Sequence, residues 1–376
     1  MKKGIAIILT LVMALSFSAC ENKETDVITG NDDINSQESV IEHTGKKIDG
    51  EITNASVFSE GLAFVQLNGN EGKIYCIDKK GNIVFEFENE TEYSLNYIPA
   101  NFKNGVAFIN GAICDKQGNF VYPEDVGVTT FYDFALDGGY IIATKITADY
   151  SSSTKELGVM NTKFEWVLPL NADLYSELEG GLFVSIYGDK EAFYSDNYIY
   201  FKGCQKFLNI ETGKVSDSSD IQLPSDTWLY NADKTMFDPT GKTVLDLKTL
   251  DNIVHTANNT YKNGKIPLIF CNEDAGKWFW TLADENLTFS FDPIEMVDYN
   301  ISSQWNWIKF DGEYVVFYDD PTNKLRSYND NGELLGELTV EDLSSGYIED
   351  GVILLVCGGR NAKTYQFYTC DFTPIF

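Results

Sequence analysis

The chain has 376 residues, of which 43% are hydrophobic and 14% aromatic, a composition typical of a globular protein rather than a disordered one. Its 57 acidic residues outnumber the 28 basic ones and give a formal charge of −29. This charge argues against nucleic acid as a partner, because affinity for the phosphate backbone comes from Lys and Arg. The sequence contains only two histidines, His43 and His255, so catalysis by paired imidazoles and a histidine-rich metal cage are close to excluded.

The N-terminus has the pattern of an export signal. A short positive head precedes an apolar run over residues 5–17, which is shorter than the roughly 20 residues that a membrane-spanning helix needs. Residues 15–20 then resemble the lipobox of bacterial lipoproteins, in which small residues precede a lipidated cysteine. The resemblance implies lipid attachment at Cys20 and a location on the extracytoplasmic face of a bacterial cell membrane. An ordinary signal peptide with an incidental cysteine is the alternative.

Three segments are expected along the chain. Residues 1–19 are assigned to the lipoprotein signal peptide. Residues 20–50 contain few large apolar side chains and no aromatic ones, so they are predicted to form a lipidated, disordered acidic tether. Residues 51–376 are expected to form a single domain of β repeats.

One motif recurs along this domain with a period near 40 residues. The segment from Phe58 to Val65 matches the segment from Phe102 to Ile109 at a displacement of 44 residues. Weaker copies follow, with glycines at positions 139, 181, 264, 312 and 351. The interval of 83 residues after position 181 is about two periods and predicts a hidden unit near residues 225–230. From position 61 to position 351, the spacing therefore predicts eight units of about 41 residues.

A second motif, Asp or Asn followed three residues later by Gly, supports the same period. It begins at Asp78, Asp115, Asp238 and Asn329, and the intervals are about one, three and two periods. Asp or Asn at this position can accept hydrogen bonds from its own backbone, and Gly supplies the positive φ that closes a hairpin. We interpret these residues as turn formers rather than calcium ligands, because the loops lack the alternating oxygen ligands of a calcium-binding loop.

The units are expected to consist of strands. Their apolar stretches are short, rich in Val, Ile, Phe and Tyr, and bounded by Gly, Asn and Asp. A unit of about 40 residues holds about four short strands, and seven or eight such units would close a β-propeller, which leaves only short edges. The predicted fold class is therefore all-β, with a seven- or eight-bladed β-propeller favoured and an open β-solenoid of hairpin repeats as the alternative.

Residues 58–65 together with residues 72–84 resemble the bacterial WG (KWG) repeat. That repeat pairs an F-x-x-G-L-A-x-V strand with a G-K-W-G-Y-I-D-x-x-G hairpin, and the match continues over residues 102–121 and 157–169. Residues 276–278 keep the Gly-Lys-Trp of the repeat. The chain is thus similar to WG repeat-containing lipoproteins. The family has no known catalytic residues, and its members are mostly described as surface or interaction proteins.

Signatures of catalysis are absent from the sequence. It contains no motif of a nucleophile-elbow hydrolase, P-loop NTPase, zincin or zinc ribbon, so we predict no catalytic residue, no metal site and no cofactor. His255 is interpreted as a strand residue. The cysteines of the repeat domain lie mostly in apolar strands, where a thiol behaves as a small hydrophobe. Cys357 and Cys370 are the one credible disulfide pair, and Cys76 and Cys114 are expected to face opposite sides of their sheets.

Two tryptophan pairs are the candidate ligand-binding residues. Trp278 and Trp280 are two residues apart, as are Trp305 and Trp307, so in a strand both members of a pair point to the same face. On a solvent-facing surface they would form a stacking platform for sugar rings or apolar peptide side chains. Against a neighbouring sheet they would be ordinary packing.

Three functions are compatible with these patterns. The favoured one is a non-enzymatic, membrane-anchored extracellular binding domain for a protein, peptide or glycan. One alternative is a carbohydrate-active enzyme on a propeller scaffold, with carboxylates near Trp278 or Trp305. The other is a structural scaffold of an envelope assembly, which would keep a constant protein partner.

Overall fold

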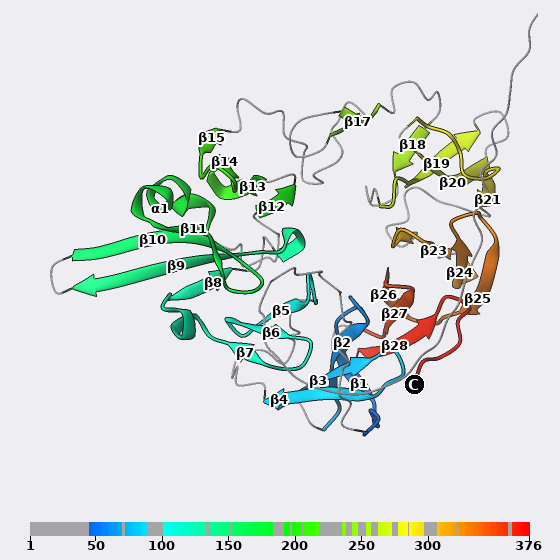
Figure 1. The fold of residues 1–376 in the computed structure, drawn as a ribbon. Coiled ribbons are helices and arrows are strands. Elements are labelled where there is room, and N and C mark those ends of the chain that lie inside the picture. Colours follow the sequence, from blue (N-terminus) through cyan, green and yellow to red (C-terminus); the bar gives the residue numbers. More distant parts are fainter. Residues whose placement is uncertain are drawn as a thin grey trace, which may run out of the picture. The chain divides into compact units, whose positions relative to one another are not determined.

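The computed structural model describes most of the chain from residue 45 onward. The described residues are 45–69, 72–88, 101–132, 136–149, 152–182, 192–195, 198–204, 206–217, 235–237, 243–246, 253–256, 262–272, 277–284, 286–296, 307–319, 322–359 and 363–376. Within these ranges the strands form eight antiparallel sheets, numbered 1 to 8 in chain order (Figure 1). The fold is therefore all-β, as predicted.

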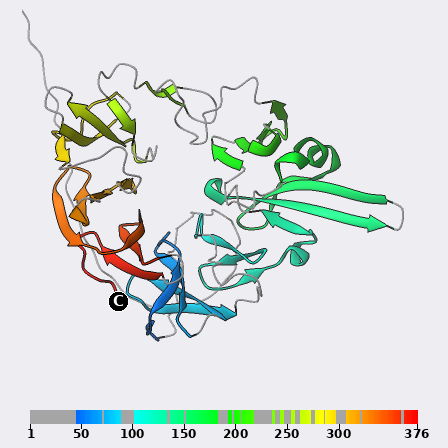
Figure 2. The same ribbon diagram turned by 180° about the vertical axis from the view of Figure 1, so that it is seen from behind.

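The first four sheets take up the N-terminal half of the domain. Sheet 1 contains β1 (Ile52–Ala55), β2 (Leu62–Leu67), β3 (Lys73–Asp78) and β4 (Ile83–Glu88), and sheet 2 contains β5 (Val106–Ile109), β6 (Ala112–Asp115) and β7 (Phe120–Val121). Sheet 3 contains β8 (Thr130–Tyr132), β9 (Tyr140–Asp149), β10 (Ser152–Asn161) and β11 (Trp166–Asn171), and sheet 4 contains β12 (Ala192–Ser195), β13 (Tyr198–Phe201), β14 (Lys206–Asn209) and β15 (Val215–Asp217). The β9–β10 hairpin extends beyond the other strands of sheet 3 (Figure 2).

The remaining four sheets take up the C-terminal half of the domain. Sheet 5 contains β16 (Thr235–Phe237) and β17 (Thr243–Asp246), and sheet 6 contains β18 (Ile253–Thr256), β19 (Ile266–Asn272), β20 (Lys277–Ala283) and β21 (Ile294–Met296). Sheet 7 contains β22 (Trp307–Phe310), β23 (Tyr314–Asp319), β24 (Lys324–Asn329) and β25 (Leu334–Thr339), and sheet 8 contains β26 (Leu343–Glu349), β27 (Val352–Cys357) and β28 (Thr364–Thr369). Sheet 5 is the unit that the long glycine interval predicted, although residues 225–230 lie outside the described ranges.

Within the described residues, one α-helix and four short 3-10 helices connect the strands. They are α1 (Ala172–Leu178), η1 (Pro123–Val126), η2 (Leu136–Gly138), η3 (Glu179–Gly181) and η4 (Lys202–Cys204). The Asn171 side chain caps α1 by accepting hydrogen bonds from the backbone N–H groups of Asp173 and Leu174 at 2.8 and 3.0 Å. Gly181 is the last residue of η3, and residues 183–191, where the motif predicts a strand, lie outside the described residues. Within the described residues, no helix is both long and apolar enough to cross a membrane.

The strands have long apolar runs because both faces of a sheet are covered. In β2, Leu62 and Phe64 pack in a core cluster shared with sheet 2, whereas Ala63 and Val65 pack in a cluster shared with sheet 8. Strand side chains alternate between the two faces, so a strand with a sheet on either side reads as a continuous hydrophobic segment.

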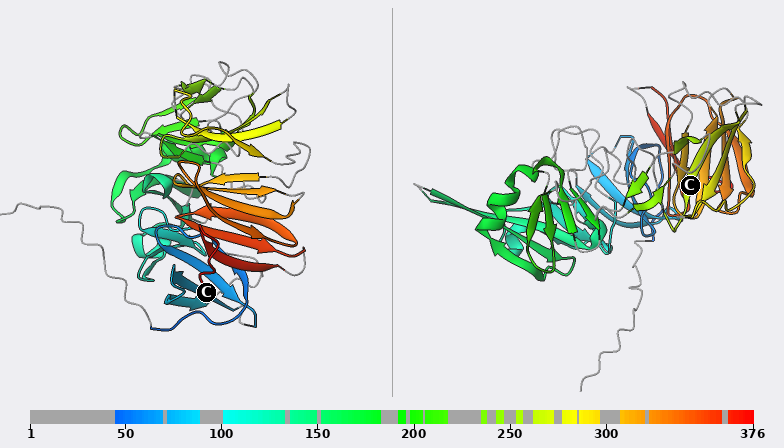
Figure 3. Two further views of the ribbon diagram at one scale, coloured as in Figure 1. Left: turned by 90° about the vertical axis from the view of Figure 1, so that its right-hand side faces the viewer. Right: turned by 90° about the horizontal axis from the view of Figure 1, so that it is seen from above.

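Core clusters join successive sheets in pairs. Six clusters connect sheets 1 with 2, 2 with 3, 3 with 4, 6 with 7, 7 with 8, and 8 with 1. Figure 3 shows the strands of sheets 7 and 8, in orange and red, lying side by side. Between sheets 8 and 1, the rings of Phe367 and Phe58 meet edge to face with centroids 5.1 Å apart. The last described sheet therefore packs against the first.

The first turn of a sheet, between its first and second strands, contains the predicted glycine. In sheet 1, Glu60 and Gly61 have φ of 53° and 86°, and Ser59 and Leu62 exchange backbone hydrogen bonds. These values define a type I′ hairpin. The same pair of positive φ values occurs at residues 263–264 and 350–351. It also occurs at residues 104–105, where Lys103 bridges Val106 ahead of β5, so β5, β6 and β7 hold the second to fourth strand positions of sheet 2.

The third turn, between the third and fourth strands, contains the Asp or Asn of the second motif. The Asp78 Oδ1 atom accepts hydrogen bonds from the backbone N–H groups of Lys80 and Asn82, both at 2.8 Å. Equivalent hydrogen bonds form at Asp115, Asn161, Asp284 and Asn329. The prediction that Asp78, Asp115 and Asn329 are turn formers is confirmed, and Asp238 lies outside the described residues.

Some third turns have no glycine. Leu287, Phe164 and Phe372 occupy the glycine position with φ of 60°, 62° and 61°. The turns that begin at Asp284 and Thr369 were not predicted, because the motif search required Gly.

Third-turn glycines pack under a side chain of the preceding repeat. A Cβ atom on Gly118 would lie 2.7 Å from the ring of Phe85, and one on Gly332 would lie 2.6 Å from the ring of Phe291. Each ring sits where a side chain would otherwise be. The glycines are therefore required by the packing between repeats as well as by their positive φ.

The same contact joins the end of the chain to its beginning. A Cβ atom on Gly81 would lie 2.8 Å from the ring of Phe376. Between sheets 7 and 8 the large and the small residue are exchanged. Gly336 of β25 stands where the ring stands in the other pairs, and it packs against Phe372, which occupies the glycine position of its own turn. The interface keeps one large and one small residue in either arrangement.

The cysteine predictions have two outcomes. Cys357 pairs with Thr364 at one end of the β27–β28 ladder, whereas Cys370 follows Thr369 at the other end. The separation of about 17 Å, from five residues at ~3.3 Å each, far exceeds the reach of a disulfide, so this candidate pair does not form one. Cys76 and Cys114 do face opposite sides of their own sheets, and both lie in the cluster between sheets 1 and 2.

Candidate functional site

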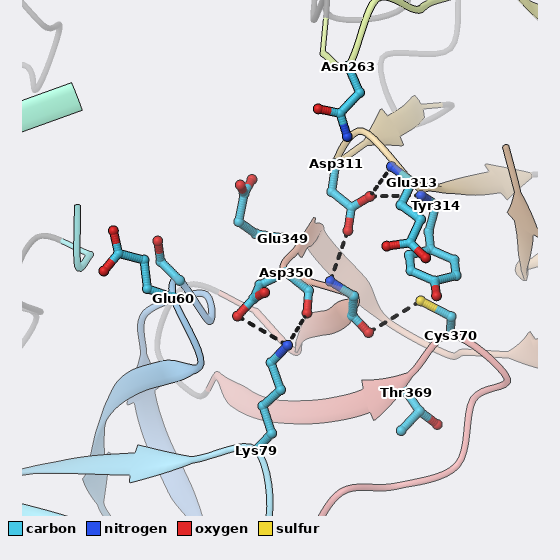
Figure 4. A pocket seen from close by; sticks show the side chains of 12 residues that line it. Glu60, Lys79, Asn263, Asp311, Glu313, Tyr314, Glu349, Asp350, Thr369 and Cys370 are labelled. Atoms are coloured by element: carbon cyan, nitrogen blue, oxygen red, sulfur yellow. Dashed lines mark hydrogen bonds and ion pairs between the residues drawn. The ribbon is translucent and has the colours of Figure 1, made fainter. Parts of the chain in front are cut away.

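A pocket of about 730 Å³ lies among the first turns of sheets 1, 7 and 8 (Figure 4). It is lined by Ser59, Glu60, Lys79, Asn263, Asp311, Glu313, Tyr314, Glu349, Asp350, Gly351, Thr369 and Cys370. Five of these residues are acidic and one is basic. The pocket is therefore polar and carries an excess of negative charge.

The type I′ geometry explains why acidic side chains gather here. It places the residue before Gly at the tip of the hairpin with positive φ, where Asn and Asp are favoured. Asp350 and Asn263 fit that preference, and Glu60 takes the same position in sheet 1. Repetition of the turn in successive sheets brings these side chains to one end of the strands.

Side chains of the first turns link each sheet to the next. The backbone N–H of Gly61 donates to Asp350 Oδ2 at 2.7 Å. The N–H of Gly351 donates to Asp311 Oδ2 at 2.9 Å, and that of Gly105 donates to Glu60 Oε2 at 3.0 Å. Carboxylates of sheets 7, 8 and 1 thus bind backbone groups of sheets 8, 1 and 2.

Asparagine side chains make the same link between sheets, but they donate the hydrogen bond instead of accepting it. Asn263 Nδ2 of the sheet 6 turn donates to the Gly312 carbonyl oxygen at 3.1 Å. Asn104 Nδ2 donates to the Leu136 carbonyl oxygen at 2.7 Å. The links run in chain order from the sheet 6 turn to the segment that precedes β9, without interruption at the junction of sheets 8 and 1.

Lysines of the third turns neutralise two of the carboxylates. Lys79 follows the turn former of sheet 1, and its Nζ lies 3.1 Å from Asp350 Oδ2. Lys116 holds the same position in sheet 2, and its Nζ lies 2.9 Å from Glu60 Oε2. Glu349 is paired with Lys262 at 2.7 Å. Glu313 is exposed and forms no ion pair shown within the described residues.

Two further groups in the pocket stay protonated at neutral pH. A hydrogen bond with Glu313, followed by partial burial, raises the pKa of Tyr314 to about 12. Burial, reinforced by Asp311 and Glu313, raises the pKa of the Cys370 thiol to about 12. Neither the phenol nor the thiol is therefore an activated nucleophile.

The tryptophan predictions lead elsewhere. Trp280 is 1% exposed and lies in the core between sheets 6 and 7, where its ring meets Phe291 and Tyr328 with centroids 5.2 and 5.1 Å away. Trp280 is thus a packing residue, and this corrects its assignment as a ligand platform. Trp278 is half-buried against the same cluster, so the pair shares a face as expected.

Other predicted residues are described only in part or lie outside the described ranges. Trp307 is the first residue of β22, but its side chain is not described, and Trp305 and Cys20 lie outside the described residues. His255 belongs to β18, which confirms its placement in a strand. The pocket was not predicted, although the polar residue before the motif glycine is visible in the sequence at Glu60 and Asp350.

Comparison with known proteins gives a short family match. A family model described as WG containing repeat matches residues 47–70, which confirms the resemblance over that segment. No curated protein matches the chain.

Several solved structures are similar to the chain at low scores. Hsv2 from Kluyveromyces lactis has 9% identity and a TM-score of 0.31 over 87% of this chain and 100% of its own. AztD from Citrobacter koseri has 10% identity and a TM-score of 0.31 over 77% and 86%. The β-propeller domain of the Trilobed protease from Pyrococcus furiosus has 12% identity and a TM-score of 0.29 over 86% and 84%. We base no argument on likeness of this degree.

Proposed function

We propose that the chain is a non-enzymatic binding domain, anchored to the outside of a bacterial membrane, that takes a positively charged group of a protein or peptide partner into the first-turn pocket. The observation that carries the proposal is the acidic pocket lining, in which Asp311 and Glu313 form no ion pair shown within the described residues. A basic group is the ligand that such a lining favours.

The scaffold proposed for this site is a closed β-propeller of eight blades. Its support is that sheets 8 and 1 are joined by the same contacts as other successive sheets. These contacts are a shared core cluster, the hydrogen bond from Gly61 to Asp350 and the packing of Phe376 on Gly81. Closure would fix the turns of sheets 7, 8 and 1 as neighbours, and a rigid scaffold preorganises a binding site.

A binding role fits the pocket better than catalysis does. Asp311 uses both carboxylate oxygens to accept backbone N–H groups, and Asp350 binds Gly61 and Lys79. These two carboxylates are therefore already engaged in contacts that join neighbouring turns. The carbohydrate-active alternative depended on exposed tryptophans beside carboxylates, and the burial of Trp280 removes part of that basis.

A panel of peptides tests the binding proposal. Lysine-rich, arginine-rich, glutamate-rich and neutral peptides of equal length, together with a glycan array, are applied to the purified chain at two salt concentrations. We expect the basic peptides to bind, and their affinity to fall as salt rises because the charges are screened. Equal affinity for all four peptides, or binding of glycans alone, would contradict the proposal.

Two variants locate the binding. Glu313→Gln removes a pocket carboxylate that forms no ion pair shown within the described residues, and we expect it to weaken the basic peptides by about two- to fivefold. Glu341→Gln is the matched control, since Glu341 is also exposed but lies outside the pocket lining. Equal effects of the two substitutions would show a nonspecific charge effect and sink the assignment to this pocket.

The membrane anchor is tested separately. When the chain is produced in a bacterium, it is expected to partition into the detergent phase of a cloud-point extraction, because a thioether-linked lipid carries two or more acyl chains. Cys20→Ala is expected to move it to the aqueous phase. Detergent partition that survives this substitution would contradict lipid attachment at Cys20.

A further inference from the structure

An apolar residue recurs at the start of the fourth strand of the sheets, immediately after the third turn. The residues at this corner position are Ile83, Phe120, Trp166, Phe289 and Leu334, each opposite the residue that precedes the turn former. In sheets 1, 3 and 7 a second apolar residue follows directly. The corner is therefore an apolar pair at the outer edge of the sheet.

In sheet 1 the chain covers its own corner with an extended segment. The backbone N–H of Ile83 donates to the Lys46 carbonyl oxygen, and the N–H of Ile48 donates to the Gly81 carbonyl oxygen, both at 2.8 Å. Lys47 forms an antiparallel bridge with Asn82. Ile83 is only 7% exposed, because it lies in the core cluster between sheets 1 and 8, against which Ile48 of the segment also packs. The segment acts as one added strand.

The equivalent corners of sheets 7 and 3 are uncovered. Leu334 and Leu335 are 55% and 37% exposed, and Trp166 and Val167 are 39% and 38% exposed. They belong to β25 and β11, the fourth strands of their sheets (Figure 1). Side chains that the fold buries in sheet 1 thus face solvent in two other repeats.

The uncovered corners also differ in charge. In sheet 1 the turn pairs Asp78 with Asn82, with the amide donating to the carboxylate at 2.8 Å. In sheet 7 the two residue types are exchanged, and Asn329 Nδ2 donates to Glu333 Oε2 at 2.7 Å. The exchange moves the carboxylate to the position that faces Lys47 in sheet 1. Sheet 3 has the same exchange, with Asn161 and Glu165.

We propose that the corner of sheet 7, at Glu333 to Leu335, binds an extended segment of a partner protein by strand addition, and that this segment carries a basic residue next to an aliphatic one. The chain's own residues 46–48 show the backbone pairing that such a segment makes. Glu333 supplies the charge complement for the basic residue, and strand addition at an open sheet edge is a recurring mode of peptide recognition. The corner of sheet 3 is a second copy of the site.

The probe is a synthetic peptide with the sequence of residues 45–50, blocked at both ends, added to the full chain. Hydrogen exchange at the Leu334 amide is the primary readout, because the equivalent amide of Ile83 is bound by the added segment. We expect slower exchange at the amides of Leu334 and Trp166. We expect no change at the amide of Phe85, whose ring packs on Gly118 of the next repeat. Unchanged exchange at Leu334 at saturating peptide overturns the proposal.

Substitutions then test the chemistry of the corner. Leu334→Glu is expected to weaken the peptide at sheet 7 by about tenfold, because it replaces an apolar contact with an unpaired charge. Glu333→Gln is expected to weaken it by about two- to fivefold. Tyr347→Glu is the matched control, since Tyr347 is 43% exposed but lies on β26, away from the corner. Equal losses for Leu334→Glu and Tyr347→Glu would overturn the site.

Two further outcomes separate this surface from the alternatives. Glu313→Gln alters the pocket and is expected to leave peptide protection at Leu334 unchanged, so the two sites fail independently. If the corner instead joins two copies of the chain, Leu334 would be protected without peptide and the protection would grow with protein concentration. That result would overturn the proposal of a separate partner.

Discussion

The two kinds of turn join neighbouring sheets by different means. First turns use polar side chains, such as Asp350, which binds the backbone of the next turn at Gly61. Third turns use steric fit, in which a ring such as Phe85 covers a glycine such as Gly118. Polar links leave lone pairs and charges facing the pocket, whereas a glycine covered by a ring presents no polar side chain to it. The difference explains why the candidate site lies at the first turns.

Tolerance of change should differ in the same way. A hydrogen-bonding link survives exchange of Asp for Glu or Asn, and the chain uses all three at its first turns. A steric link survives enlargement of the glycine only if the large partner becomes small. Gly336 and Phe372 show this arrangement, with the small residue on the strand and the large one in the turn. At a third turn, the sizes of two contacting residues must therefore match. At a first turn, only the hydrogen-bonding capacity of one side chain is constrained.

The largest effect is expected from a side chain at a third-turn glycine. Gly332→Ala places a Cβ atom 2.6 Å from the Phe291 ring at a φ of 78°. Left-handed strain costs about 1–2 kcal/mol and overpacking typically about 1–3 kcal/mol. We expect the free energy of unfolding to fall by roughly 2–5 kcal/mol in denaturant titration.

The matched control is a first-turn glycine. Gly61→Ala meets nothing within 4 Å at a φ of 86°, so only the backbone strain of about 1–2 kcal/mol applies. If both substitutions cost the same, the ring above the third-turn glycine contributes nothing, and the contrast between the turns is wrong.

A smaller effect is expected from breaking one polar link. Asp350→Ala leaves the Gly61 N–H without its acceptor and should cost about 1–3 kcal/mol in unfolding free energy. Asp350→Asn keeps an acceptor oxygen and loses mainly the ion pair with Lys79, so most of the stability should return. An equal loss in both variants would show that charge, and not the hydrogen bond, maintains the link.

Much of the fold could be predicted because the repeat is carried by local turn chemistry. Asp78 and Gly81 determine a hairpin from four residues, so their spacing revealed strands and period together. Turns with Leu287 or Phe372 in place of Gly were not predicted, because the motif is defined by Gly. Packing of Phe372 against Gly336 offsets the strain of its positive φ. The helix at residues 172–178 was not predicted, because its seven residues are too few for an apolar stripe longer than two turns.

The site was harder to predict because it depends on contacts between repeats. Glu60 and Asp311 are far apart in sequence and contribute to one pocket only after sheets 1, 7 and 8 pack together. Aromatic pairs are conspicuous in a sequence, yet the alternation of strand faces gives no sign of whether a neighbouring sheet covers them. A neighbouring sheet does cover Trp280. The exposed Leu334 was not predicted as a surface residue of interest.

The smallest expected effect concerns a charge pair that reverses the usual polarity. In sheet 7, Asp330 stands where Lys79 stands in sheet 1, and its Oδ2 lies 2.6 Å from Lys265 Nζ of the preceding repeat. Either Lys265→Asp or Asp330→Lys alone should cost about 0.2–1 kcal/mol, because the pair is partly exposed. The double exchange should restore most of that loss at low salt and less at high salt. Denaturant titration of the four proteins measures the coupling. A double variant that loses the sum of both single costs would show that the position, and not the pairing of opposite charges, determines stability at this first-turn contact.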